Sequence, residues 1–324
     1  MFTYTLRRLL YSIPVLLAAT FIIFAFVRST VDPAAAFRQN PYFSQRALNA
    51  FIERKHLDKP IPVQYGYWLK GALTGDLGTT IRGDRPIWPQ LRRVFGNTMQ
   101  LIIAAELLAV LLAIAIGVIS AVRQYSLFDY ASTTFSFLGF ATPIFWLALI
   151  LQIIFTNIFL DTGKRIFYTA GLSSPDPGSG LHFLMDRVQH LALPVFVLAV
   201  VGIAQFSRYM RASMLEVINS DYVRTARAKG LIERRVIMKH GFRNALIPLV
   251  TVVALDFGAL FGGAIVTETV FSLDGMGLFF IHALEAGDAY QIMAWLAVTA
   301  TIIILFNLIA DLLYGVLDPR IRYE

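Results

Sequence analysis

The sequence contains no cysteine, which excludes disulfide bonds, thiolate metal sites and catalysis by a thiol. Charge is also scarce. Only 15% of the 324 residues are Asp, Glu, Lys or Arg, whereas a soluble protein of this length carries about 25%. Hydrophobic residues make up 57% of the chain instead. This balance is typical of a membrane protein and not of a soluble enzyme.

Motifs for chemistry are missing as well. No phosphate-binding loop of the form G-x-x-x-x-G-K-[ST] occurs, and no lysine follows the glycine pair Gly78 and Gly83. The five histidines are scattered and form no metal-binding pattern. We therefore expect a non-catalytic chain that holds no cofactor or metal. The net charge of +7 would suit nucleic acid, but the basic residues gather in loops beside apolar segments. Membrane topology explains them, so no nucleic-acid partner is expected.

Six apolar stretches approach or exceed the roughly 20 residues that cross a bilayer as a helix. They are Leu9–Val27, Met99–Val122, Ala131–Leu160, Leu191–Phe206, Ala245–Val266 and Ile292–Val316. The fourth is short and is interrupted by Pro194. The first follows two arginines like a secretory signal, but its length and the lack of a small-residue cleavage site predict a retained anchor. The predicted fold class is all-α, with six transmembrane helices.

The distribution of Lys and Arg predicts the orientation of these spans. Basic residues mark one side of the membrane, at Arg7 and Arg8, at Arg123, in the loop Arg208–Arg243, and at Arg320 and Arg322. Short basic loops stay in the cytoplasm, so both termini are expected there. The segment after the first span is also basic, but loops of about 70 residues largely escape the charge rule.

Three parts of the chain follow from these spans. We predict an anchor helix over residues 1–28, an external segment over 29–96, and a core over 97–324 that includes a cytoplasmic loop over 208–245. In the external segment, the polar stretch Ser44–His56 is compatible with a helix. Proline and glycine then recur from Pro60 to Pro89, which predicts turns and short helices and not a second large domain.

The cytoplasmic loop carries the strongest pattern in the chain. Arg208–Arg243 contains nine Lys or Arg residues against three acids. Within it, apolar positions alternate with charge in a helix–glycine–helix pattern that turns at Gly230. The apolar positions are Tyr222, Val223, Ala226, Ala228, Leu231, Ile232, Val236 and Ile237. Such an amphipathic element can lie on the lipid or bind a soluble partner.

Acidic residues inside the spans are the remaining candidates for function. Glu106, Asp256 and Asp311 lie within spans, and buried charges in a bilayer usually face the protein interior or water. Asp311 is near the end of its span and can reach the membrane interface. Asp256 lies near the middle of the fifth span, so we expect it to line a transport path, with packing against a partner as the alternative. Glu106 is either a path residue or a buried packing residue.

Long ordered segments of the chain resemble one family. They are RRLLYSIPVLL (Arg7–Leu17), LDKPIPVQYGYWL (Leu57–Leu69), GDLGTT (Gly75–Thr80), TPIFWLALIL (Thr142–Leu151), DYVRTARAKGL (Asp221–Leu231), HGFRNALIP (His240–Pro248), GALFGGAIVTETVFS (Gly258–Ser272) and NLIADLLYGVLDPRIR (Asn307–Arg322). The basic loop resembles the cytoplasmic "EAA" loop of ABC-importer permeases. Together the segments resemble the B-type permease subunit of dipeptide and oligopeptide importers, which lie in a bacterial-type inner membrane.

This resemblance implies a set of partners. They are a second homologous permease, two ATP-binding cassette subunits that bind ATP and Mg, an extracytoplasmic substrate-binding protein and a peptide. The segment 221–239 would fit into a cleft of an ATPase. Its coupling residues would be Asp221, Arg224, Ala226, Arg227, Gly230, Glu233 and Arg234. The segment Ser29–Gly96 and the loop Thr267–Ala289 would contact the binding protein on the other side.

Some features depart from the family pattern or leave alternatives open. The places of the first Glu and Ala of the EAA pattern hold Arg224 and Thr225, as in the peptide branch, and Asp256 stands where an uncharged polar residue is expected. Permeases for nickel or glutathione are very similar, and the sequence does not exclude these cargoes. A secondary transporter or channel, with coupled ions at Glu106 or Asp256 and a loop bound to anionic lipid, is the rival from another class.

Overall fold

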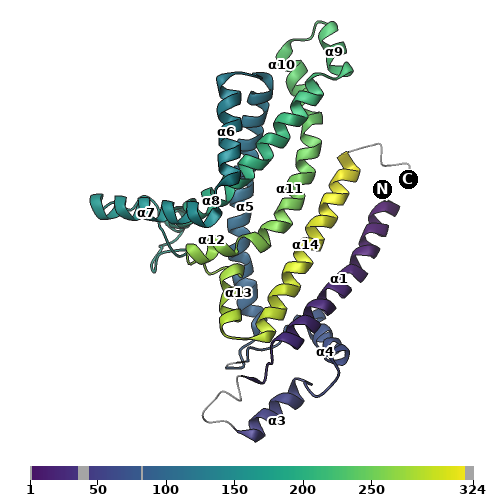
Figure 1. Cartoon of the computed structure of the whole chain (residues 1–324), viewed down its shortest axis with the longest axis vertical. Coiled ribbons are helices and arrows are strands. Elements are labelled where there is room, and N and C mark those ends of the chain that lie inside the picture. The colour runs from purple at the N-terminus through teal and green to yellow at the C-terminus, as the bar shows by residue number, and fades with distance from the viewer. Residues whose placement is uncertain (1, 36–43, 82, 318–324) are drawn as a thin grey trace. The chain divides into compact units, whose positions relative to one another are not determined.

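The computed structural model describes residues 2–35, 44–81 and 83–317. These residues form α-helices joined by turns, with one isolated antiparallel bridge between Thr79 and Pro86. Figure 1 shows the order of the helices along the chain. Contacts divide the chain into two compact units. The first holds Met99–Leu273 and the chain from Phe306 onward, and the second holds Thr3–Thr98 and Asp274–Leu305.

Six helices in the described part of the chain are long and apolar enough to cross a membrane, as the sequence predicts. They are α1 (Phe2–Thr30), α5 (Ile87–Val122), α7 (Ile144–Thr162), α8 (Leu181–Ile218), α11 (Arg243–Gly263) and α14 (Ala289–Leu317). Helix α11 follows a short helix α10 (Glu233–Arg235) and a π-helix η1 (Val236–Phe242), so this candidate span begins at Glu233.

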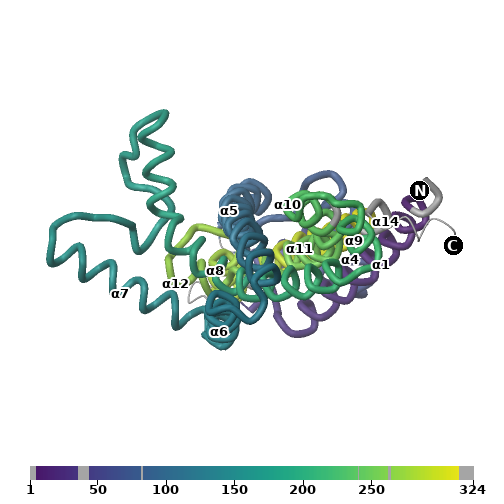
Figure 2. The backbone as a smooth tube through the Cα atoms, turned by 90° about the horizontal axis from the view of Figure 1, so that it is seen from above, coloured from purple at the N-terminus to yellow at the C-terminus, as the bar shows by residue number. Residues whose placement is uncertain are grey.

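The third predicted span, Ala131–Leu160, is wrong as a single helix. It consists of α6 (Leu127–Ala141) and α7, which are separated at Thr142 and Pro143. Thr142 has an extended ψ of 121°, because the residue before a proline is pushed away from the helical region. Helix α6 packs along α8, and α7 leaves this pair in another direction, which Figures 1 and 2 both show.

The fourth span differs from its prediction in the opposite sense. Helix α8 runs unbroken through Pro194, and 72% of its most apolar stretch is buried, the largest share of any span in the described chain. Its polar residues find partners inside the protein. Asp186 accepts a hydrogen bond from Ser174 Oγ at 2.6 Å, and the ring of His190 stacks on Tyr168 at 3.7 Å between centroids. Helix α8 also continues to Ile218, so Arg208 and Arg211 belong to this helix and not to a loop.

The core of the first unit is built around α8. Buried residues of α5, α8 and α11 form one cluster, which contains Ala109, Ala113, Ala121, Ala199, Ile203, Phe206, Met210, Met214, Ala245 and Leu249. The alanines let the helices approach closely. One close approach is at Gly117 of α5, where an added Cβ would lie 2.6 Å from Met210 Cβ and 2.8 Å from Ser207 O. A short helix α12 (Ile265–Val270) packs on α7 and α8.

The second unit contains the external segment that the sequence predicts to be turns and short helices. The short helices of this unit are α3 (Gln45–Arg54), capped by the Ser44 side chain, α4 (Ile61–Leu73) and α13 (Met276–Glu285). Helix α4 is anchored to α1, where Tyr65 Oη lies 2.9 Å from Thr20 Oγ1. The turn that follows α4 is held by Asp288, whose carboxylate accepts a hydrogen bond from Ile81 N at 2.7 Å.

Candidate functional site

The candidate coupling element is the connection between α8 and η1. It contains α9 (Asp221–Ala228), a turn at Gly230 and α10, and it lies at one end of α8 and α11 (Figure 1). Gly230 has a φ of +72°, a conformation that L-residues rarely adopt. No atom lies within 4 Å of the position of an added Cβ. The turn therefore requires glycine for its backbone conformation and not for lack of space.

The inner face of this element packs on its own chain. Val223, Ala226 and Val236 are at most 5% exposed and form a small core, against which Val217 and Leu231 pack. Ala226, which the sequence analysis assigns to coupling, is thus a contact between α9 and the π-helix. Only part of the predicted apolar stripe is available to a partner.

The outer face of α9 and its turn is exposed. Asp221, Tyr222, Arg224 and Lys229 point away from this core, and Ile232 is 78% exposed. Asp221 and Arg224 are 3.7 Å apart, with most of both side chains in solvent. The outer face therefore combines basic residues with an exposed tyrosine and an exposed isoleucine, which suits a protein partner better than it suits bulk water.

Two further predicted coupling residues bind each other across the turn. Arg227 Nη2 donates to Glu233 Oε1 at 2.9 Å, and its Nε lies 3.2 Å from Oε2. Arg227 also donates to the carbonyl of Ile218 at 3.4 Å. Exposed pairs of this kind contribute up to about 1 kcal/mol. The pair joins the end of α8, helix α9 and helix α10 around the glycine.

Arg234 lies elsewhere, at a hollow between α5 and the π-helix. The hollow has a volume of about 470 Å³ and is mostly apolar, with Val118, Ile119, Val122, Arg123, Ile237 and Met238 as its other lining residues. The structure therefore brings Arg227, Gly230 and Glu233 together and places Arg234 on a separate surface.

Hydrogen bonds connect the coupling element to the spans. Asn244 Nδ2, in the first turn of α11, donates to Tyr222 Oη at 3.2 Å. Ser213 Oγ of α8 donates to the carbonyl of Ala245 at 2.9 Å. The π-helix η1 ends just before Asn244 and Ala245, which make these two hydrogen bonds. Segments of π-helix are frequent at functional sites. Arg227 of α9 donates to the carbonyl of Ile218 at the end of α8, so a displacement of α9 would be passed to both α8 and α11.

The sequence analysis missed a buried ion pair that joins α6 to α8. Asp129 is 3% exposed, and its two oxygens accept hydrogen bonds from Arg211 at 2.6 and 2.8 Å. The Ser120 hydroxyl and the Tyr125 amide also donate to this carboxylate. The Arg211 guanidinium, helped by these donors, lowers the pKa of Asp129 well below its usual range. No local pattern signals a pair of residues so far apart in sequence.

The two intramembrane acids chosen from the sequence line one small cavity. It has a volume of about 70 Å³ between α5, α8 and α11, and its polar lining residues are Glu106, Asp256 and Gln205. Glu106 Oε1 is buried and has no hydrogen-bond partner among the described residues. The analysis of the sequence missed Gln205, because a lone glutamine in a helix does not stand out. The cavity brings together three polar side chains, and its other lining residues are apolar or glycine.

Six candidate spans in the described part of the chain, together with an exposed basic turn, define a class, the polytopic membrane proteins. Among solved structures, the MetNI methionine ABC transporter in an inward-facing conformation contains a chain with the same fold. The TM-score is 0.55 at 16% identity, over 71% of this chain and 96% of the other.

The family follows from sequence. Residues 113–323 match the family of binding-protein-dependent transport system inner membrane components, and the chain belongs to this family. The oligopeptide transport system permease protein AppB of Bacillus subtilis is 39% identical over 324 residues, which is 100% of both chains. The dipeptide transport system permease protein DppB of Escherichia coli K12 is 36% identical, also over 100% of both chains. The chain is therefore a multi-pass subunit of a membrane transporter.

Proposed function

We propose that this chain is the permease subunit of an ATP-driven importer that moves dipeptides or oligopeptides into the cytoplasm. The observation that supports peptides as the cargo is the full-length similarity to permeases named for oligopeptide and dipeptide transport. The similarity covers all of this chain, so it is not limited to a shared fold. Nickel and glutathione remain the alternatives that the test below must separate.

The proposed complex contains further subunits. A chain without a phosphate-binding loop needs ATPases from outside, and the family resemblance implies two of them, with ATP and Mg bound at their own sites. It also implies a second homologous permease and an extracytoplasmic binding protein. The excess of Lys and Arg in the short loops supports an orientation with both termini in the cytoplasm.

The proposed coupling surface is the outer face of α9 and its turn. Its exposed Tyr222, Arg224 and Ile232 would contact an ATPase, and Arg227, Gly230 and Glu233 would keep the turn in shape. The support is that the same element is hydrogen-bonded to α8 through Arg227 and to α11 through Tyr222, so that closure of the ATPases would move two spans as rigid bodies.

The proposed path residues are Glu106 and Asp256, now together with Gln205. A carboxylate in the bilayer is unfavourable unless it meets water or a partner. The shared cavity supports a polar region between α5, α8 and α11 that a passing peptide amine could approach. Discrimination among peptides by charge would then depend on these side chains.

The test is uptake by the purified complex in proteoliposomes. With its permease partner, both ATPases, the binding protein and ATP, we expect uptake of a labelled tripeptide but not of nickel ions or glutathione. Uptake should stop without ATP or without the binding protein. Peptide transport by this chain alone, or uptake that follows an ion gradient in the absence of ATP, would overturn the proposal in favour of a secondary transporter.

A further inference from the structure

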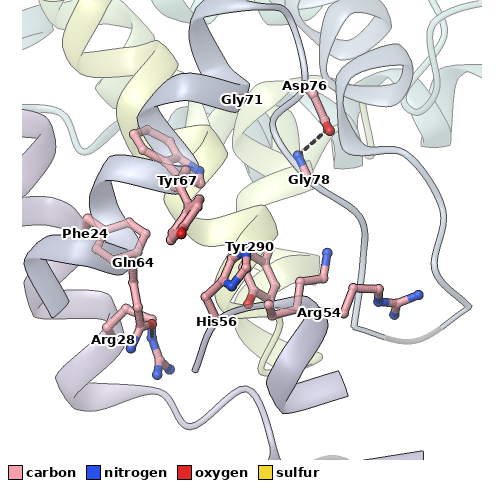
Figure 3. Close-up of a pocket in the computed structure, with 12 residues that line it drawn as sticks. Phe24, Arg28, Arg54, His56, Gln64, Tyr67, Gly71, Asp76, Gly78 and Tyr290 are labelled. Atoms are coloured by element: carbon pink, nitrogen blue, oxygen red, sulfur yellow. Dashed lines mark hydrogen bonds between the residues drawn. The ribbon is translucent and has the colours of Figure 1, made fainter. Parts of the chain in front are cut away.

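A second polar cavity lies in the other unit and is used by none of the functions above. It has a volume of about 250 Å³ and is formed by α1, α4, the residues after α3 and the start of α14. Figure 3 shows its lining residues, among them Arg28 of α1, His56 and Tyr290 of α14. The groups that line it are mainly hydrogen-bond donors and aromatic rings.

The first donor is the guanidinium of Arg28. Its Nε donates to Gln64 Oε1 at 2.9 Å, and Gln64 in turn donates to the carbonyl of Lys59 at 2.7 Å. This relay fixes the guanidinium at the cavity. The amide is neutral, and within the described chain no carboxylate lies within ion-pair distance of Arg28, so its charge remains uncompensated.

The second donor is the ammonium of Lys55. It donates to Thr79 Oγ1 at 2.9 Å and lies 4.8 Å from the centre of the Tyr290 ring. Burial lowers the pKa of Lys55, and the neighbouring Arg54 adds to this effect. Arg54 itself is neutralised by Asp84, at 2.8 Å. The carboxylates of Asp84, Asp76 and Asp288 act in the opposite direction and favour the charged form of Lys55, but none of the described carboxylates lies at ion-pair distance from its ammonium.

Two more donors at the cavity have no acceptor. Trp68 Nε1 and Tyr290 Oη are buried, and neither has a hydrogen-bond partner in the part of the chain that the structure describes. Tyr290 is only 7% exposed. Buried donors are almost always satisfied in proteins, so two at one cavity point to a missing acceptor. Asp76 also lines the cavity, but one of its oxygens accepts from Gly78 N at 2.8 Å in a turn.

Four donors, two of them positively charged, select an oxyanion. The surroundings of the cavity indicate which kind of molecule carries this oxyanion. Arg28 lies in the last turn of the candidate span Thr5–Thr30, where the membrane interface falls. Large side chains near the cavity face outward, with Phe26 65%, Tyr67 52% and Leu73 80% exposed. Tyrosine and tryptophan at such a level form the aromatic belt of membrane proteins.

We propose that this cavity binds the phosphate of an anionic phospholipid, with Arg28, Lys55, Trp68 and Tyr290 as its donors. The acyl chains would lie along the exposed apolar side chains of α1 and α4. The same phosphate chemistry could come from free phosphate, which lacks the acyl chains that those side chains would hold. The inference does not depend on the transported cargo.

The experiment is native mass spectrometry of the purified transporter titrated with phosphatidylglycerol or phosphatidylcholine. We expect a saturable site for phosphatidylglycerol. Because a hydrogen bond to a charged group is strong, Arg28→Gln and Lys55→Gln should each weaken it about tenfold. Tyr290→Phe removes only a hydroxyl that has no partner in the structure, so it leaves the fold intact and should weaken binding about threefold.

Lys70→Gln is the matched control. Lys70 lies on α4, is exposed and does not line the cavity, so the same change of charge there should leave lipid binding unchanged. An equal loss from Lys70→Gln and Lys55→Gln would overturn the proposal, because it would indicate general attraction to charge. So would equal binding of phosphatidylcholine, or displacement of the lipid by inorganic phosphate, which would assign the cavity to a free anion. The binding readout is independent of transport.

Discussion

Gly230 shows how one residue can be required for its backbone alone. Its φ of +72° excludes most side chains, while the space around it is open. The expectation from the sequence, that a sharp turn depends on this glycine, matches the conformation found here. The physical reason for its intolerance is strain in the left-handed region and not a clash, and this difference separates the variants that should fail from those that should work.

We predict a graded effect of substitution at this position. Asn tolerates the left-handed region, Ala costs about 1–2 kcal/mol there, and a β-branched Val costs more. Gly230→Asn should therefore keep ATP hydrolysis responsive to loaded binding protein, Gly230→Ala should weaken the response, and Gly230→Val should abolish it or release the ATPase. Binding protein should still dock to all three. Equal activity of the Asn and Val variants would show that the turn does not depend on this conformation.

A second prediction at the residue scale concerns Asp256. The chain has no cysteine, so Asp256→Cys would introduce a single thiol. If residue 256 lines a hydrated path, a water-soluble thiol reagent should modify it, to an extent that differs between nucleotide states. Ala254→Cys, at a buried position of the same helix, is the control and should stay unreactive. Asp256→Asn should change the relative uptake of peptides of different charge but not assembly.

An Asp256→Cys variant that never reacts, together with unchanged uptake by Asp256→Asn, would mean that the carboxylate only packs against a neighbour.

Ala226 differs from Gly230 because its side chain is buried. At 5% exposure it belongs to the small core below α9, so Ala226→Asp would bury an unpaired charge. Its effect on coupling would come from a disordered α9 and not from a lost contact with an ATPase.

Among the elements, α6 and α8 depend on each other through Asp129 and Arg211. Removing the carboxylate leaves the Arg211 side chain, which is 28% exposed, without its partner, and the loss of hydrogen bonds to a charged group costs about 1.5–3 kcal/mol. Asp129→Asn should therefore lower the thermal unfolding midpoint of the purified chain markedly. Asp221→Asn, which alters an exposed pair, should leave it unchanged.

The same pair gives a dependence on pH. Because the pKa of Asp129 is lower in the folded protein than in the unfolded chain, its contribution is complete above the unfolded pKa of about 3.9. It is lost as the pH falls through the lower folded pKa. Wild type and Asp129→Asn should thus differ most in stability at neutral pH and converge in acid. A constant difference at every pH would contradict the assignment.

The composition of the sequence predicts the presence of helices better than it predicts where they begin and end. Apolar length alone predicts six spans, and the same number is found in the described chain. Proline was misleading in both directions. Pro143 begins a new helix after an extended Thr142, whereas Pro194 is buried inside α8. Its neighbours Leu193 and Val197 pack in one core with residues of α5 and α7, and this packing keeps the helix continuous despite the lost hydrogen bond. The outcome depends on tertiary contacts, which a local pattern does not contain.

The same limit applies to the candidate site. A turn at Gly230 between two short helices follows from the residues, because glycine interrupts an amphipathic pattern. The ion pairs of Arg227 with Glu233 and of Asp129 with Arg211 do not follow from the residues alone, since each pair forms only when the chain has folded back on itself. The shared cavity of Glu106, Gln205 and Asp256 likewise needs three helices in place before it exists.

At the scale of the whole molecule, the two sides of the membrane should meet different partners. Asp274 lies beside the predicted external segment, because it forms an ion pair with Arg93 of that segment at 3.0 Å. The Asp274 side chain is 52% exposed. By contrast, Thr267 and Glu268 at the start of the predicted contact loop are fully buried, so these two residues cannot touch a partner directly. Residues 36–43 and 82 of the external segment lie outside the described residues.

We predict that a photocrosslinking residue at position 274 will reach the binding protein and one at position 229, on the exposed turn after α9, will reach an ATPase. Mass spectrometry of the crosslinked products in the assembled complex distinguishes the two. Products with the partners exchanged would reverse the proposed orientation of every span. Crosslinks from both positions to the same partner would refute the assignment of two separate docking sides.

The unbroken course of α8 has a mechanical consequence. At 1.5 Å per residue, the helix is about 57 Å long, and its tight packing on Gly117 at Met210 lies about 12 Å from the end next to α9 and about 44 Å from the other end. A rod that pivots at that point would be a lever with unequal arms. A small sideways push on the short arm would swing the far tip between about three and four times as far.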